Sequence, residues 1–237
     1  GSLVRVTREP IGVVGLICPW NFPIAIPSWK IAPALAYGNC VVCKPADLVP
    51  ATAHALAEII ARAGTPAGVF NLVMGRGSVV GQTLLEHKDV SAISFTGSVP
   101  TGRRVAAAAV AASPMKRVQL EMGGKNPLVV LDDADLGVAV EVAVNGSFFG
   151  TGQRCTASSR IIVTEGIHDR FVAAVAERMQ GLVIDDALKP GTDIGPVVDE
   201  NQLEQDLAYV RIGQEEGARL VTGGERLKRD TPGFYLA

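Results

Sequence analysis

Residues 92–111 read AISFTGSVPTGRRVAAAAVA, and this one stretch combines a strand, a turn and a helix. Ala92–Phe95 is a short apolar run, the polar Thr-Gly-Ser follows it, and Val99–Ala111 is an alanine-rich segment of helical length. A strand that leads directly into a helix is the repeating unit of parallel sheets covered by helices. The stretch therefore predicts a protein of the α/β class.

The same alternation of strand and helix extends in both directions from this stretch. Apolar runs predict further strands at Ile11–Ile17, Cys40–Cys43, Val69–Val73, Val118–Glu121, Leu128–Leu131 and Ile161–Thr164. Helical patterns predict further helices at Ala51–Ala63, Ala134–Phe148, Phe171–Met179 and Leu203–Ile212. Continuous apolar runs are typical of parallel strands, so we expect these strands to be covered on both faces.

Individual residues mark where helices begin and end. Pro50 suits the start of the helix at residues 51–63, and Gly64 suits its end. Asp133 is the expected N-cap of the helix at residues 134–148. Gly123-Gly124 interrupts the first series of units, so we expect two domains, 1–122 and 123–237.

The composition excludes several classes of protein and partner. With 22 basic and 24 acidic residues the net charge is −2, which gives no electrostatic reason to expect nucleic acid or a membrane surface. A hydrophobic content of 48% argues against disorder. No apolar run is long enough to span a bilayer, and the start does not resemble a signal peptide. Four cysteines without a secretory signal predict a reducing, cytoplasmic location.

Cys40 and Cys43 form a C-x-x-C pattern, which is typical of redox and metal sites. Val41 and Val42 instead predict a buried strand, where positions three apart face opposite sides. The three histidines are scattered along the chain, so we expect no metal site. A thiol-redox role for this cysteine pair remains an alternative that native alkylation would test.

Cys155 has a different setting, in the polar and glycine-rich segment GTGQRCTASS. A cysteine on such a loop beside Arg154 is better placed to react, because a nearby cation increases the thiolate fraction. Two further candidates follow predicted strands. Glu121 precedes Gly123-Gly124, and Asn21 lies between two prolines that fix its loop, where an amide can stabilise an oxyanion. The alternative for each of these three residues is an ordinary structural position in a loop or turn, with no catalytic role.

Two glycine-rich turns are candidates for binding phosphate. Phe95-Thr-Gly-Ser98 follows a strand and precedes a helix, whose first N–H groups can hold a pyrophosphate. Gly75-Arg-Gly77 with Gly81 is the second turn. Neither matches the G-x-G-x-x-G fingerprint, so each alone is weak evidence.

Taken together, these segments resemble the aldehyde dehydrogenase superfamily, from about Val6 to the C-terminus. The motifs occur in the family's order and at its spacings: PWNFP at 19–23, KPAD at 44–47, FTGS at 95–98, EMGGKNP at 121–127 and GQRC at 152–155. The resemblance implies a Rossmann-like, parallel-sheet NAD(P)-binding domain at 1–122 and an α/β catalytic domain at 123–237, both partial. Three longer stretches, KPADLVP, FTGSVPTGRRVA and GQRCTASSR, most resemble bacterial 2-oxoglutarate semialdehyde dehydrogenases.

The resemblance also implies a role for each matched residue. Cys155 would attack the aldehyde, while Asn21 and the Cys155 N–H stabilise the oxyanion. After hydride transfer, Glu121 would activate the water that hydrolyses the thioester. The family's cofactor contacts map onto Trp20, Lys44, Asp47, Gly97 and Ser98.

Two departures from the family qualify these expectations. A longer acidic residue commonly occupies the position of Asp47, so the preference between NAD and NADP is open. Family members also extend beyond both ends of this chain, so we expect a central fragment that lacks the oligomerisation strand. The full-length protein is expected to be a homo-oligomer, a dimer or a tetramer. Arg154 is a candidate for holding a substrate carboxylate, although anchoring its loop is the alternative.

Two alternative functions stay open. A CoA-acylating aldehyde dehydrogenase shares the fold and the cysteine but generally lacks the glutamate at the position of Glu121. A non-catalytic protein or an inactive fragment of the same fold is the other alternative. Intact Asn21, Glu121 and Cys155 argue against lost activity in the parent protein.

Overall fold

The structure, a computed structural model, describes residues 2–237 and divides them into two compact units. The first unit ends at Gly123 and the second runs Gly124–Ala237. The division expected from the sequence, after residue 122, lies one residue before this boundary. Each unit has its own sheet and its own hydrophobic core.

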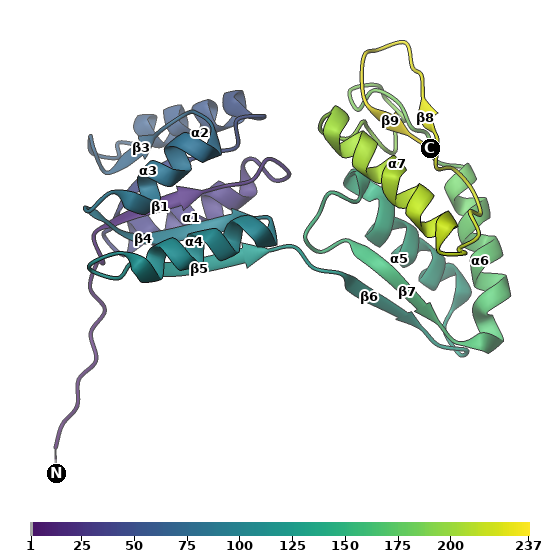
Figure 1. The fold of residues 1–237 in the computed structure, drawn as a ribbon, viewed down its shortest axis with the longest axis horizontal. Helices are drawn as coiled ribbons and strands as arrows, with labels where there is room; N and C mark the ends of the chain where they lie inside the picture. The colour runs from purple at the N-terminus through teal and green to yellow at the C-terminus, as the bar shows by residue number, and fades with distance from the viewer. Residues whose placement is uncertain (1) are drawn as a thin grey trace. The chain divides into compact units, whose positions relative to one another are not determined.

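The first unit is a five-stranded parallel sheet with helices on both faces (Figure 1). Its strands are β1 (Val13–Ile17), β2 (Cys40–Lys44), β3 (Phe70–Leu72), β4 (Val90–Gly97) and β5 (Arg117–Met122). Its helices are α1 (Ala25–Ala36), α2 (Pro50–Arg62), α3 (Gln82–Glu86) and α4 (Val99–Ala111), with a π-helical turn at Gly77–Gly81.

The strand order β3-β2-β1-β4-β5 contains a change of direction. From β1 the chain adds β2 and β3 on one side, and then returns to add β4 and β5 on the other. Leu16 of β1 is in register with both Cys43 and Ser94, in the two neighbouring strands. Because all five strands are parallel, their carboxyl ends meet at one edge, and α/β proteins bind ligands where the order reverses.

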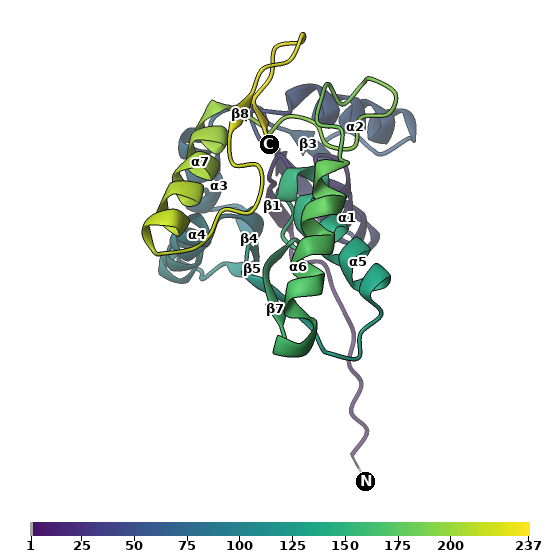
Figure 2. The ribbon, with the colours of Figure 1, turned by 90° about the vertical axis from the view of Figure 1, so that its right-hand side faces the viewer.

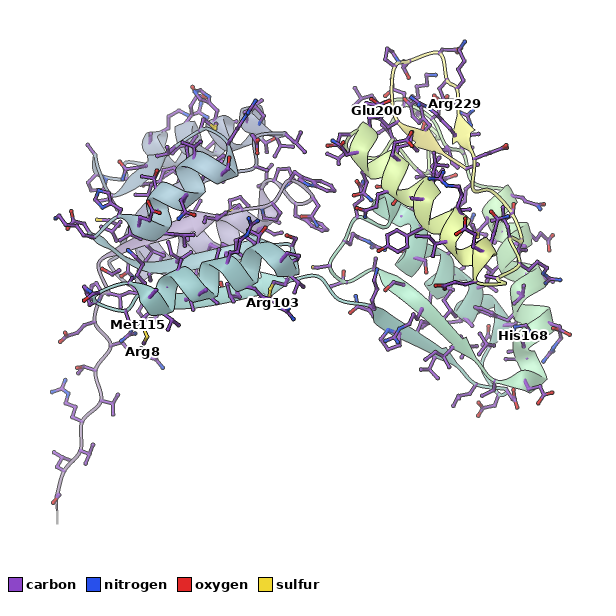
Figure 3. All side chains as sticks on the ribbon, in the orientation of Figure 1. Arg8, Arg103, Met115, His168, Glu200 and Arg229 are labelled. Carbon is purple, nitrogen blue, oxygen red and sulfur yellow. The ribbon has the colours of Figure 1, made fainter. Side chains whose placement is uncertain are left out.

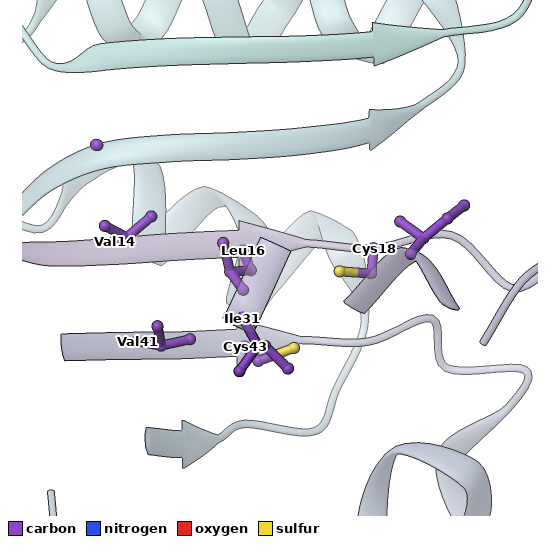
Figure 4. Close-up of a cluster of buried hydrophobic side chains, with 8 residues drawn as sticks. Val14, Leu16, Cys18, Ile31, Val41 and Cys43 are labelled. Atoms are coloured by element: carbon purple, nitrogen blue, oxygen red, sulfur yellow. The ribbon is translucent and has the colours of Figure 1, made fainter. Parts of the chain in front are cut away.

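The core of this unit is formed by the apolar runs that predicted the strands. On one face, Leu16 and Val41 pack with Ile31 of α1, and Leu16 and Val41 are fully buried (Figure 4). On the other face, Ile93 packs with Val105 of α4. Full burial of one such side chain stabilises a fold by about 1.5–3 kcal/mol.

The second unit has a parallel pair of strands, β6 (Asn126–Val130) and β7 (Ser158–Val163). Helices α5 (Leu136–Phe148) and α6 (Glu165–Gln180) run side by side and pack against this pair (Figures 1 and 2). A 3₁₀ turn at Phe149–Gly152, the helix α7 (Glu200–Glu215) and an antiparallel pair, β8 (Arg226–Leu227) and β9 (Tyr235–Leu236), complete the unit.

The expectation that all strands are covered on both faces is wrong for β6 and β7. Leu128 and Ile161 face the core that α5 and α6 form. Val129 and Ile162 point to the opposite face and are 57% and 53% exposed. Alternation places successive side chains on opposite faces, so a continuous apolar run does not by itself require a second covering layer.

Most predicted elements occur, and the differences have physical reasons. Pro50 starts α2 and Ala63 caps it, so the predicted ends were close. The N-cap of α5 is Asp135 instead of Asp133, and its carboxylate accepts a hydrogen bond from Val138 N at 2.9 Å. The sequence predicted no helix over residues 25–36, where α1 forms despite the interior Pro33.

The helices of the described chain carry exposed polar side chains. Examples are Arg103 of α4 and His168 of α6, which project from their helices (Figure 3). Over residues 2–237, no helix is long and apolar enough to cross a bilayer. In the same range, no three His, Cys, Asp or Glu side chains gather as ligands for a metal ion.

Candidate active site

The loop that carries Asn21 connects the carboxyl end of β1 to α1. Cys18 N donates to Lys44 O at 3.0 Å, which ties the start of this loop to the end of β2. Asn21 Oδ1 accepts a hydrogen bond from Phe22 N at 3.1 Å. Trp20 and Asn21 are both half-buried. The loop therefore holds an amide side chain at the carboxyl edge of the sheet.

Lys44 ends β2 at the same edge, with a side chain that is only 4% exposed. Its Nζ lies 3.5 Å from Asp47 Oδ1, and the Asp47 side chain is 58% exposed. A Cβ added to Gly77 would lie 3.9 Å from Lys44 Nζ, so the second glycine-rich turn passes close to this ammonium. The buried Lys44, the exposed Asp47 carboxylate and the glycine-rich turn at Gly77 thus lie close together.

Gly97 and Ser98 join β4 to α4. Ser98 is the N-cap of α4, and its Oγ donates to Thr101 Oγ1 at 3.0 Å. A Cβ on Gly97 would lie 2.6 Å from the Phe95 ring, so only glycine fits at this point. The first N–H groups of α4 have no acceptor within the helix, which makes this terminus suited to an anion.

Glu121 lies near the end of β5, within a chain of polar side chains. Gln119 Nε2 donates to Glu121 Oε1 at 2.9 Å, and Gln119 Oε1 accepts from Lys30 Nζ of α1 at 3.1 Å. Lys30 Nζ also donates to Ser94 Oγ at 2.6 Å. Burial lowers the pKa of Lys30, while the nearby Cys18 sulfur and the Glu121 carboxylate oppose that shift.

The first unit thus brings its predicted site residues to one edge of one sheet. Each follows or ends a parallel strand: Trp20 and Asn21 after β1, Lys44 and Asp47 at β2, Gly97 and Ser98 at β4, and Glu121 at β5. Strands β1 and β4 flank the point where the strand order reverses. Open α/β sheets generally bind nucleotides at the carboxyl ends of the strands beside such a point.

Cys155 belongs to the second unit, where it follows the turn after α5. Gly150, Thr151 and Gly152 all have positive φ, at 63°, 57° and 66°. Two of these positions are glycines, which adopt this conformation without a steric cost. Cys155 itself is exposed and reduced. The tight turn explains why the segment before the cysteine is rich in glycine.

Two side chains hold the Cys155 loop in place. Asn126 Nδ2 donates to Cys155 O at 2.7 Å and to Ala157 O at 3.0 Å. Arg154 Nη2 donates to Asn145 O and, at 2.9 Å, to Gly146 O, in the last turn of α5. A guanidinium at a helix C-terminus satisfies carbonyls that lack helical partners. These contacts favour the anchoring role of Arg154 over carboxylate binding, although its buried Nε has no partner among residues 2–237.

Sequence reasoning assigned no role to several residues that the structure places in the site. Lys30, Ser94 and Gln119 come from three elements, and no local pattern indicates that they form the hydrogen-bonded chain that ends at Glu121. Asn126 was part of a quoted motif, EMGGKNP, yet its contact with the Cys155 loop spans 29 positions. Ser94 is one of three polar residues in β4, with Ser91 and Thr96, so its polarity alone does not single it out.

The whole chain matches one protein family. A family profile described as "Aldehyde dehydrogenase family" matches residues 1–237. The chain is 51% identical, over 99% of its length, to the alpha-ketoglutaric semialdehyde dehydrogenase of Bacillus subtilis, of which it covers 48%. It is 47% identical, over 93% of its length, to the 2,5-dioxopentanoate dehydrogenase of Saccharolobus solfataricus, of which it covers 46%. The chain therefore spans about half the length of the curated relatives it matches.

A solved structure extends the similarity to the fold. The crystal structure of a betaine aldehyde dehydrogenase from Staphylococcus aureus, in complex with NAD+, matches 94% of this chain with a TM-score of 0.90 and 40% sequence identity. The match covers 44% of that protein. At this level of identity and overlap, the two chains share their fold over nearly all of the present sequence.

Proposed function

The chain belongs to the aldehyde dehydrogenase family, and from this premise we propose that its full-length protein oxidises an aldehyde to a carboxylic acid with NAD or NADP. The observation that carries the proposal is the setting of Cys155. It is the one exposed cysteine among the four, on a tight loop that Asn126 and Arg154 anchor. Cys18 and Cys43, in contrast, are packed into a hydrophobic core.

We assign the first half of the reaction to Cys155 and Asn21. The thiolate of Cys155 adds to the aldehyde carbon, and the carbonyl π electrons move to oxygen to give a tetrahedral thiohemiacetal. The Asn21 amide and the Cys155 N–H donate hydrogen bonds to that oxyanion. When bound, the dinucleotide supplies the acceptor for the hydride that leaves this carbon, and a thioester on Cys155 remains.

We assign the second half to Glu121. Its carboxylate takes a proton from water as the water oxygen attacks the thioester carbonyl. Collapse of the resulting adduct releases the carboxylic acid and returns Cys155 as the leaving thiolate. A general base is needed because water at neutral pH is a weak nucleophile, and a solvent-exposed carboxylate can supply this function.

The residues at the edge of the first sheet suit a dinucleotide. Lys44 would bind the adenosine ribose together with Asp47, and Ser98 would bind the pyrophosphate at the start of α4. The absence of a side chain at Gly97, where a Cβ would meet the Phe95 ring, leaves the backbone bare for close approach. Trp20 would form part of the wall of the pocket.

For the substrate we propose a semialdehyde that ends in a carboxylate, such as 2-oxoglutarate semialdehyde. The two relatives with names for this compound support the choice, at 51% and 47% identity. The structural neighbour is named for betaine aldehyde, a cation. Betaine aldehyde is therefore the most informative competitor, because it differs from the proposed substrate in the sign of its charge.

Substitution of the nucleophile tests the proposed function. In the full-length protein, Cys155→Ala should abolish aldehyde oxidation and leave NAD affinity within about threefold, because only the thiolate is removed. Cys40→Ala is the matched control, since Cys40 lies in β2 and should leave turnover unchanged. Aldehyde oxidation that survives in Cys155→Ala would exclude Cys155 as the nucleophile.

A further inference from the structure

Four side chains form a continuous hydrogen-bonded chain on one face of the first sheet. Ser94 of β4 and Gln119 of β5 are direct partners in the parallel register, as are Thr96 and Glu121. Alternation along β5 places Gln119 and Glu121 on the same face. Lys30 of α1 reaches this face and donates to both Ser94 and Gln119. The chain ends at the Glu121 carboxylate.

The chemistry of the partners fixes how the Gln119 amide is oriented. An ammonium group only donates hydrogen bonds, and an ionised carboxylate only accepts them. The Gln119 oxygen must therefore face Lys30, and its NH2 group must face Glu121. Ser94 Oγ also donates to the Gln119 oxygen, which reinforces this orientation. The opposite orientation would set NH2 against the ammonium and oxygen against the carboxylate.

We propose that Gln119 is a positioning residue that holds the Glu121 carboxylate ready for thioester hydrolysis. The proposal rests on the function of Glu121 proposed above. Within residues 2–237, Gln119 supplies the hydrogen bond to Glu121, and it uses only Oε1. Oε2 then remains available to take the proton of the attacking water. A carboxylate fixed in one orientation reaches the transition state with less loss of conformational freedom.

Because of where Gln119 lies, its proposed role in holding Glu121 can be tested without disturbing the stability of the fold. Its side chain is exposed on the edge strand β5, outside the hydrophobic clusters. A single hydrogen bond at an exposed position contributes little to the stability of the fold, because water can replace the lost partner. Replacement by an apolar side chain of similar length should therefore leave the fold intact while freeing the Glu121 carboxylate.

The test measures the two halves of the reaction separately in the full-length protein. Rapid quenching followed by mass spectrometry gives the rates at which the acyl group appears on Cys155 and then decays. For Gln119→Met we expect acylation within about twofold of wild type and decay slowed about tenfold, which is less than the roughly 100-fold or more expected when the general base itself is lost, because Glu121 is still present. Decay within twofold of wild type would overturn the proposal, as would equal slowing of both steps.

Two further variants make the result specific. Gln202→Met is the matched control, because Gln202 Nε2 donates to Asp206 Oδ1 at 2.8 Å in the second unit, and it should change neither step. Ser94→Ala removes one donor to the Gln119 oxygen and should slow decay about threefold. If Gln119→Met does not fold, unchanged decay in Ser94→Ala overturns the proposal. If wild type forms no acyl-Cys155, the proposed function itself fails.

Discussion

At the scale of the residue, the four cysteines differ in burial and in hydrogen bonding. Cys43 is 2% exposed, and its hydrogen bond with Cys18, followed by burial, raises its pKa. That thiol therefore stays protonated in the core beneath α1 (Figure 4). Cys155 lies on an exposed loop with its backbone carbonyl fixed by Asn126. Only an exposed and positioned thiol can meet a substrate from solvent.

Glu121→Gln should separate hydride transfer from hydrolysis. The variant keeps the shape of the side chain but loses its capacity to take a proton, so thioester hydrolysis should slow more than hydride transfer. In stopped-flow experiments on the full-length protein, a burst of NADH should persist while steady turnover falls by at least about 100-fold. Loss of the burst with retained cofactor binding would show that Glu121 is not primarily the base for hydrolysis.

Asp47→Glu should shift cofactor preference toward NAD. Asp47 pairs with Lys44 but is a short side chain, so at the proposed ribose site both its contact with a 2′-hydroxyl and its repulsion of a 2′-phosphate would be weak. Glutamate reaches further, and Coulomb repulsion grows as the distance shortens. The ratio of the two kcat/KM values should rise by about threefold or more in favour of NAD. Asp89→Glu, an exposed carboxylate paired with Lys88, is the control, and an unchanged ratio in Asp47→Glu would reject the assignment.

At the scale of the element, the start of α5 differs from its prediction, because the N-cap is Asp135 and not Asp133. Asp135 accepts the hydrogen bond from Val138 N, so Asp135→Ala should cost about 1 kcal/mol of local helix stability. Hydrogen exchange in the peptide covering residues 134–142 should become roughly fivefold faster. Asp133→Ala is the matched control, and faster exchange in that variant instead would restore Asp133 as the cap.

Elements with local signals could be predicted, and those that depend on distant contacts could not. Strands β1, β2 and β4 are apolar runs, and Pro50 marks the start of α2. Pro33 lies within α1 and removes one helical hydrogen bond, so the local pattern argued against a helix that packing with β1 and β2 stabilises. Strands β8 and β9 have two residues each, which is too few for the alternation of apolar and polar residues typical of a strand to be recognised.

At the scale of the whole molecule, the motifs predicted where the candidate residues of the first unit lie, but not the contacts that support them. Each candidate residue of the first unit ends or follows a parallel strand, so the topology brings them to one edge. Lys30 and Gln119 are 89 positions apart, and their contact depends on where α1, packed against β1 and β2, places the Lys30 side chain. Such a contact is a property of the folded unit and leaves no local pattern in the sequence.

The proposed substrate also involves the whole molecule, because the acid end of a semialdehyde bound at Cys155 would have to be held at a distance from that residue. A carboxylate needs a cation or several N–H donors. Arg154 is adjacent to Cys155, the proposed nucleophile, but its Nη2 donates to Asn145 O and Gly146 O. We therefore expect selectivity for acidic aldehydes to come from other groups, including parts of the full-length protein beyond this chain.

A panel of aldehydes on the full-length protein tests this expectation. The kcat/KM for 2-oxoglutarate semialdehyde and succinic semialdehyde should exceed that for hexanal or benzaldehyde by at least about tenfold, or about 1.4 kcal/mol in transition-state binding. Arg154→Lys loses the paired contacts with the end of α5, so activity should fall for acidic and neutral aldehydes alike and leave their ratio unchanged. A selective loss for the acidic substrates would instead identify Arg154 as their carboxylate ligand. If hexanal performs as well as the semialdehydes in the unmodified protein, the proposed substrate class is wrong, while family membership stands.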